Sequence, residues 1–180
     1  MTRWMLALLV LGLGLPGPAP AKEKAHSATT VLVMPFELVD TSLQGELEGS
    51  KRDLGWVHHL TGYVEGLLRD SGRYRILDRK PVAGLINTFQ DDYRYVYRCR
   101  TCAVKAAREA GADLVVVGWV QKVSNLIRNL TIRVQDGKTG KVVAGGWTSL
   151  RGNTPVMLRR AARQVVTTHI LKPAGNAAGP

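Results

Sequence analysis

Residues 112–124 read ADLVVVGWVQKVS, and this stretch decides the fold. From Asp113 to Val120 both alternating sets of positions are apolar, which is typical of a strand buried on both faces. Two further β-rich runs follow at 126–136 and 141–150, with the turn sequence GKTG between them at 137–140. In the first of these runs apolar residues alternate with polar ones, so one of its faces is less buried. We therefore predict a central strand followed by an antiparallel meander.

Short apolar runs and helical patterns alternate on both sides of this stretch. An apolar run with β-branched residues, Thr30–Leu38, predicts a first strand with Pro35 near its end, and 74–78 predicts a second. Apolar residues recur at helical spacing in four other segments, namely 54–68 (with Asp53 as a cap and Gly72 beyond its end), 81–89, 101–111 (with Thr101 as its cap and Gly111 as its stop) and 154–171. The prediction is an α/β (α+β) fold, with a single mixed sheet of about five strands and helices packed on it.

The amino terminus has the pattern of an export signal. Arg3 precedes an apolar core from Trp4 to Leu15, and Ala19-Pro20-Ala21 fits a small-x-small cleavage site. We expect cleavage after Ala21 and a periplasmic protein. The mature chain would have a tether at 22–29, one domain at 30–171 and a disordered tail at 172–180, with no membrane span.

The chain is basic, with 25 Lys plus Arg against 14 Asp plus Glu and a formal net charge of +11. Only Arg3 lies in the export signal, so the basic character belongs to the mature protein. This balance favours an acidic partner, and export argues against nucleic acid as that partner. We expect a periplasmic or envelope protein.

Tyrosines and arginines are interleaved at 93–100. In an extended chain Tyr93, Tyr95, Tyr97 and Cys99 would share one side and the arginines the other. Such a pattern also fits a stacking platform for single-stranded nucleic acid, but we favour tyrosines that cover the core and arginines that face an acidic partner. The closing helix displays three more arginines. The candidate partner-binding residues are Arg94, Tyr95, Arg98, Arg100, Arg159, Arg160 and Arg163.

Cys99 and Cys102 are the only cysteines of the chain. In an oxidising compartment a CxxC pair is expected to cross-link, so a structural disulfide is the first interpretation. The pair also precedes a predicted helix, whose dipole would stabilise a thiolate, so a redox-active pair stays open. A part of a metal site is the third alternative.

Known catalytic motifs are missing from the sequence. It contains no GxGxxG after a strand, no GxxxxGK[ST], no HExxH and no GxSxG. His58 and His59 are adjacent, so on a helix they point about 100° apart and do not form an i, i+4 metal pair. We therefore predict no catalytic residue, cofactor site or metal site, and a protein that is not an enzyme.

Several stretches together resemble a known family. These are 111–127, 136–140, 150–154, VMPFE at 33–37, YRILD at 74–78 and the cysteine pair. They resemble a family of exported bacterial proteins that carries a domain-of-unknown-function label, some of whose members are encoded near periplasmic quinoprotein alcohol dehydrogenase systems. At lower resolution the order of elements is similar to the amino-terminal domain of TolB and to CsgG-type envelope proteins, which implies an α/β domain that assembles with envelope components.

Two functions follow from these expectations. The first is a non-catalytic periplasmic accessory module that binds a protein of an envelope complex or of a periplasmic dehydrogenase system. The alternative is a thiol-disulfide redox protein that uses Cys99 and Cys102.

Overall fold

The computed structural model of the protein describes residues 28–42, 50–152 and 154–172. The predicted export signal, most of the tether and nearly all of the predicted tail lie outside these residues. The strands are β1 Thr29–Val33, β2 Glu37–Asp40, β3 Tyr74–Ile76, β4 Leu114–Lys122, β5 Ile127–Asp136 and β6 Val142–Arg151. The α-helices are α1 Ser50–Asp70, α2 Ala83–Asp92, α3 Cys102–Ala110 and α4 Pro155–Val165. Short 3-10 turns, η1 Lys80–Val82 and η2 Val96–Arg98, and a π-helical segment, η3 Val166–Ile170, complete the described elements.

The sheet is mixed and has six strands in the order β3-β1-β4-β5-β6, with β2 paired to β4 beside β1. Strands β1 and β2 run parallel to β4, whereas β5 and β6 form an antiparallel meander with it. The predicted fold class, the central position of the 113–120 stretch and the meander are therefore confirmed. The sheet has one strand more than expected because the first apolar run forms two strands.

The prediction of one strand at Thr30–Leu38 was wrong. The chain leaves the sheet between Val33 and Glu37 and then rejoins β4 further along. Pro35 lies in this break and has no N–H to donate, and the Phe36 N–H donates to Thr61 Oγ1 of α1 at 3.0 Å instead of to a strand. The break directs the Phe36 ring over the sheet, where Gly118 of β4 leaves room for it.

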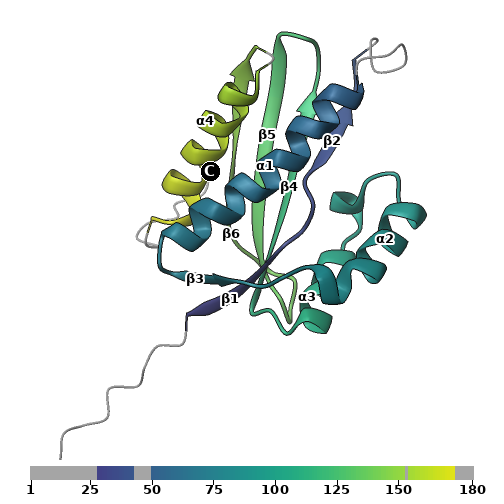
Figure 1. Cartoon of the computed structure of the whole chain (residues 1–180), viewed down its shortest axis with the longest axis vertical. Coiled ribbons are helices and arrows are strands. Elements are labelled where there is room, and N and C mark those ends of the chain that lie inside the picture. Colours follow the sequence, from purple (N-terminus) through teal and green to yellow (C-terminus); the bar gives the residue numbers. More distant parts are fainter. Residues whose placement is uncertain (1–27, 43–49, 153, 173–180) are drawn as a thin grey trace, which may run out of the picture.

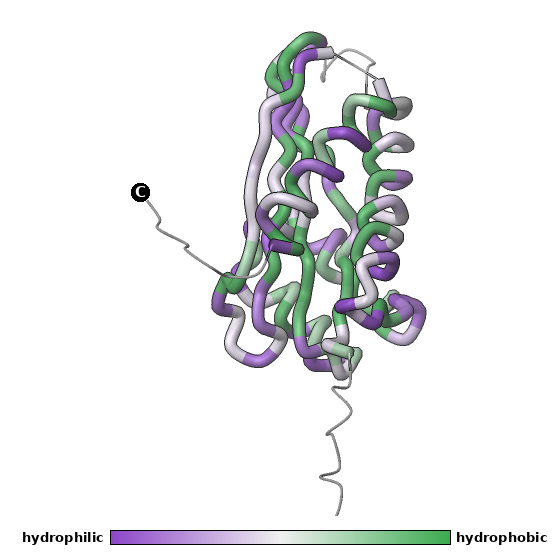
Figure 2. The backbone as a smooth tube through the Cα atoms, turned by 90° about the vertical axis from the view of Figure 1, so that its left-hand side faces the viewer, coloured by the Kyte–Doolittle hydropathy of each residue, from purple (hydrophilic) through white to green (hydrophobic). Residues whose placement is uncertain are grey.

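Helices cover the two faces of the sheet unequally. Figure 1 shows α1 crossing in front of the strands with α4 beside it, and α2 and α3 at the lower right. Helices α1 and α4 pack on one face around Phe36, Leu60, Ile132 and Leu158. Helices α2 and α3 cover part of the other face around Leu32, Met34, Ile86, Ala106 and Val117. In Figure 2 the helices show green apolar turns alternating with paler or purple polar ones, as amphipathic helices do.

The ends of three helices follow local sequence signals, and the first is Gly72, which has φ of 70° just beyond the end of α1. Thr154 is the N-cap of α4, and its side chain accepts a hydrogen bond from the Met157 N–H. Gly111 ends α3 in the left-handed conformation, with φ of 68°. Thr101 is the N-cap residue of α3 as predicted, but its hydroxyl makes no capping hydrogen bond.

Candidate site: an arginine ridge and a cavity beside the disulfide

The segment after α2 is extended at Tyr93 and Tyr95 but not at 96–98, so the predicted alternation of its side chains as far as Cys99 is wrong. Val96–Arg98 forms the 3-10 turn η2. The Glu37 carboxylate of β2 accepts hydrogen bonds from the N–H groups of Val96 and Tyr97, at 2.7 Å each. These are the first two N–H groups of η2, which otherwise lack partners. Glu37 therefore fastens this segment to the sheet and turns the chain.

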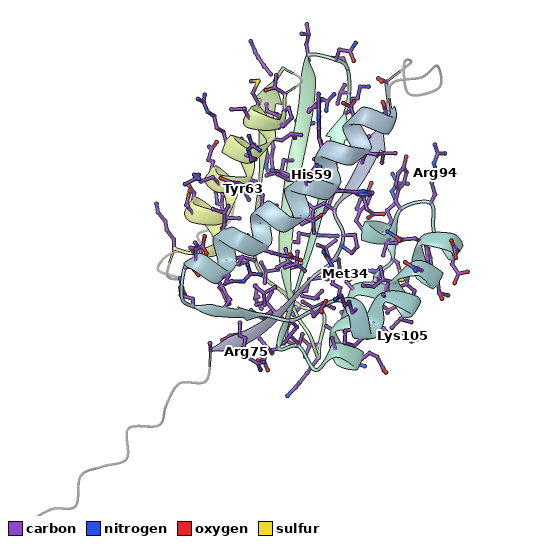
Figure 3. The ribbon with its side chains drawn as sticks, in the orientation of Figure 1. Met34, His59, Tyr63, Arg75, Arg94 and Lys105 are labelled. Carbon is purple, nitrogen blue, oxygen red and sulfur yellow. A yellow bond between two sulfur atoms is a disulfide. The ribbon has the colours of Figure 1, made fainter. Side chains whose placement is uncertain are left out.

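We call Arg94, Tyr95, Arg98 and Arg100 the arginine ridge. The guanidinium carbons of Arg94 and Arg98 lie 5.4 and 5.7 Å from the centre of the Tyr95 ring, within the range of cation-π contacts. All three arginines of the ridge are exposed. Among the residues that the structure describes, no carboxylate forms a salt bridge with any of them. Figure 3 shows Arg94 on the loop that follows α2, far from α4.

The arginines of the closing helix form a separate surface. Arg159, Arg160 and Arg163 are exposed on α4, which packs on the face of the sheet opposite to α2 and α3. The Arg163 Nε–H donates to the Tyr63 hydroxyl of α1 at 3.0 Å, and Figure 3 shows Tyr63 on α1 beside α4. The candidate partner-binding residues therefore divide into two groups, and the structure does not bring them together.

A cavity of about 410 Å³ lies beside the ridge. Its walls come from the chain around β2, from α2, η2 and the start of α3, and from β4 and β5. Apolar side chains form part of the lining, among them Met34, Ile86 and Val117. The polar lining residues are Glu37, Gln90, Arg98, Arg100, Arg133 and Gln135.

Two aromatic rings and an arginine form one wall of this cavity. The Tyr97 and Trp119 rings stack with their centres 4.5 Å apart and their planes 16° from parallel. The guanidinium of Arg133 lies 4.8 Å from the centre of the Trp119 ring, and its Nη2 donates to the Tyr97 carbonyl at 3.0 Å. Sequence reasoning missed Trp119 and Arg133. Arg133 had only its place on the partly polar face of its strand as a signal, and Trp119 lies in the run that we expected to be apolar on both faces.

Glu37 has an altered acidity. Burial raises the pKa of its carboxyl above the ordinary value, and the hydrogen bonds from Val96 and Tyr97 offset only part of that effect. Both carboxylate oxygens are occupied by these two N–H groups.

Cys99 and Cys102 are joined by a disulfide with their Cα atoms 5.5 Å apart. Cys102 is the first residue of α3, and Cys99 is half-buried and lines the cavity. The disulfide therefore links η2 to α3 across the cavity wall. Among the described residues, no group of three or more His, Cys, Asp or Glu is placed to hold a metal ion.

The sheet face next to the cavity is partly uncovered. Trp119 of β4, Thr131 of β5 and Trp147 of β6 lie opposite one another in register, so their side chains share that face. Trp147 is 67% exposed. This face therefore combines the exposed Trp147 with Trp119 and its partners Tyr97 and Arg133, and aromatic residues and arginine are enriched in protein interfaces.

A buried ionic cluster lies at the far end of β4 and β5. Asp53 of α1 lies 3.2 Å from Lys122 Nζ and 2.9 Å from Arg128 Nη2, and Asp40 lies 3.2 Å from the same Lys122 Nζ. Lys122, Arg128 and Asp53 are each at most 1% exposed. Asp53 was predicted to cap the helix. It instead lies within α1 and pairs with these two cations.

Within the described residues, no helix has the length and apolar character needed to cross a membrane. A profile of the family described as "Protein of unknown function (DUF2380)" matches residues 29–170. None of the curated proteins matches the sequence.

Several solved structures are similar to this chain at low identity. The LpoB C-terminal domain from Salmonella enterica is 15% identical over 71% of this chain and 86% of its own, with a TM-score of 0.49. Lipoprotein GNA1162 from Neisseria meningitidis is 17% identical over 70% and 82%, with a TM-score of 0.45. TolB from Acinetobacter baumannii is 13% identical over 76% of this chain but 26% of its own, with a TM-score of 0.41. The expected similarity to TolB is therefore weak.

Proposed function

The chain belongs to the family described as "Protein of unknown function (DUF2380)", and we propose that it is a non-catalytic accessory module that binds an acidic protein partner in the bacterial envelope. The observation that carries the proposal is the arginine ridge. Its guanidinium groups are exposed, and no described carboxylate pairs with them. Cationic side chains of this kind guide an acidic partner to one orientation and increase the rate of association.

The ridge is also held in place before any partner arrives. Glu37 fixes the backbone of Val96 and Tyr97, the disulfide links Cys99 to α3, and two arginines lie on the Tyr95 ring. A surface that is ordered in advance loses less conformational entropy on binding. Export to the periplasm and association with a periplasmic dehydrogenase system or another envelope complex are parts of the same proposal.

In-cell cross-linking of the tagged full chain, followed by affinity purification and mass spectrometry, tests this function. The ridge variant Arg94→Gln, Arg98→Gln, Arg100→Gln is compared with the matched variant Arg159→Gln, Arg160→Gln, Arg163→Gln, which loses the same number of charges from α4. We expect recovery of an acidic partner to fall about tenfold in the ridge variant and to remain in the α4 variant. A partner that is lost from the α4 variant, or equally from both, would place binding elsewhere and refute the role of the ridge.

A second function is favoured by one observation, the place of the disulfide. Cys99 lies in the cavity wall, where we expect a thiol of another protein to reach it. In a thiol-disulfide protein, that thiolate attacks one sulfur of the disulfide, forms a mixed disulfide and releases the other cysteine as a thiolate. The variant Cys99→Ser, Cys102→Ser separates the two functions in the same experiment. A partner that both forms retain supports the binding module, and partners trapped only through the thiols support the redox protein.

A further inference from the structure

The charges that line the cavity do not balance. Three arginines line it, namely Arg98, Arg100 and Arg133, and Glu37 is the one carboxylate among its described lining residues. That carboxylate already accepts two backbone hydrogen bonds at 2.7 Å, and no described arginine forms a salt bridge with it. The cavity therefore has an excess of positive charge in a partly enclosed space, where an anion is screened less by water than at the open surface.

The Arg133 side chain, which lines the cavity, has a buried donor without a partner among the described residues. Its Nη2 bonds to the Tyr97 carbonyl, and its guanidinium lies against Trp119, so the group has a defined position. Its Nε–H is buried and has no hydrogen-bond partner in the part of the chain that the structure describes. A buried donor without a partner loses free energy unless a ligand or water satisfies it.

The first turn of α3 faces the same space. Ala103 lies in that turn and lines the cavity, and the helix is nine residues long. The N-terminus of a helix carries a partial positive charge from its free N–H groups. This adds to the preference for an anion that the three arginines create.

The apolar part of the lining indicates that the anion has an organic skeleton. Met34, Ile86 and Val117 contribute apolar surface, and the volume of about 410 Å³ falls in the range of small-molecule sites. An inorganic anion would leave this apolar surface in contact with water. An organic acid would cover it with its carbon skeleton and direct its carboxylate to a guanidinium.

We propose that the cavity binds the carboxylate of an organic ligand, with Arg133 as its main partner and with Arg100 and Arg98 at the same site. The ligand is either a free organic acid or a carboxylate that a bound protein inserts, such as a C-terminus. Arg98 and Arg100 belong to both the arginine ridge and the cavity, whereas Arg133 belongs to the cavity alone, so Arg133→Gln tests this proposal apart from the proposed function. If a carboxylate binds in the cavity but no protein partner is captured, the proposed function fails and this inference stands. If a partner is captured but no carboxylate binds, this inference fails and the proposed function stands.

Nuclear magnetic resonance of the exported full chain tests this inference. Sodium benzoate is titrated while the indole N–H of Trp119 and the arginine Nε–H signals are followed. Benzamide serves as the uncharged analogue and sodium chloride as the ionic-strength control. We expect saturable shifts with benzoate alone, and an affinity about tenfold lower in Arg133→Gln. The matched variant Arg159→Gln, on the opposite face, keeps the full affinity.

A peptide with a free carboxyl terminus and its amidated form distinguish the two sources of the carboxylate. If only the free-terminus peptide binds, the ligand comes from a protein. If benzoate binds by itself, a free organic acid is sufficient. The inference is wrong if neither probe binds, if benzamide binds as well as benzoate, or if Arg133→Gln binds benzoate unchanged. Should Arg133→Gln fail to fold, the exposed Arg100→Gln takes its place, with an expected loss of about threefold.

Discussion

Gly118 of β4 has no side chain, and this allows the ring of Phe36, which lies in the break between β1 and β2, to pack directly on the strand. A Cβ at this position would lie 2.3 Å from the Phe36 ring, and Phe36 is itself 2% exposed. Gly118→Ala should therefore lower the free energy of unfolding by about 1–3 kcal/mol, because the buried ring has no space to move into. Urea denaturation followed by circular dichroism measures the change.

Gly62 provides the control for this substitution. It lies on α1, is exposed, and has no atom within 4 Å of the position that a Cβ would take. Gly62→Ala should raise the free energy of unfolding by about 0.5–1 kcal/mol, since alanine loses less backbone entropy in a helix. Equal effects of the two substitutions would show that the contact with Phe36 is unimportant.

Single residues also show which parts of the site were predictable. The end of α3 at Gly111 and the start of the closing helix at Thr154 were predicted, because helix ends depend on local backbone geometry, which nearby residues reveal. Lys122 and Arg128 were not recognised as buried, because a charged residue in a strand is ordinarily on the exposed side. Their burial depends on Asp53 of α1, whose contact with Arg128 joins residues 75 positions apart in the sequence.

At the scale of elements, this ionic cluster holds the start of α1 against β4 and β5. Asp53→Asn would leave Arg128 without its carboxylate and Lys122 with Asp40 alone. The free energy of unfolding should fall by about 3–5 kcal/mol, because removing one partner leaves buried charges uncompensated. Urea denaturation again provides the measurement.

The matched control is Glu65→Gln, which breaks the pair between Glu65 and Arg79. The atoms of that pair lie 3.1 Å apart, but the Arg79 side chain is 33% exposed. We expect a loss below about 1 kcal/mol. A loss of the same size in Asp53→Asn would mean that water reaches the buried cluster.

Whole elements were predicted well where the pattern was periodic and poorly where it was not. Helices α1 and α4 and the meander follow from helical spacing and alternation. The run TVLVMPFELV at 30–39 is apolar except for Thr30 and Glu37, and this pattern does not reveal that β1 and β2 contact β4 at different points. The tyrosine segment at 93–99 alternates like a strand, yet Glu37 caps η2 there from a distant position in the chain.

Across the whole molecule, acid stability depends on carboxylates such as Asp113. The hydroxyl and N–H groups of Thr30 donate to Asp113 and lower the pKa of its carboxyl. Because the unfolded chain then takes up the proton at a higher pH than the folded chain, this stabilisation is present above about pH 4 and is lost as the pH falls through the folded value.

Asp113→Asn should therefore be less stable than the wild type at pH 7 and equally stable at about pH 2. Thermal unfolding at a series of pH values measures this difference. Thr30→Val, which removes the hydroxyl donor but retains the shape of the side chain, should reduce the same pH dependence. If the difference between Asp113→Asn and the wild type is constant with pH, the Asp113 charge does not contribute.

The cavity is a property of the whole molecule, which explains why sequence reasoning did not reach it. Its lining residues extend from Met34 to Gly140, and the pattern at 93–100 marked Tyr97, Arg98 and Arg100 but not Trp119 or Arg133. The net charge predicted an anionic partner. The position of the site depends on how η2, β4 and β5 meet, which local patterns do not encode.

The pairing of β1 with β4 has a consequence for the order in which the chain folds. Thr30 and Asp113, which join these strands, are 83 residues apart in the sequence, whereas β5 and β6 are joined by a turn at 137–140. Closing the longer loop costs about 3 kcal/mol more chain entropy than closing the turn. The carboxy-terminal hairpin therefore has the entropic advantage over the pairing of β1 with β4, and we expect it to form earlier.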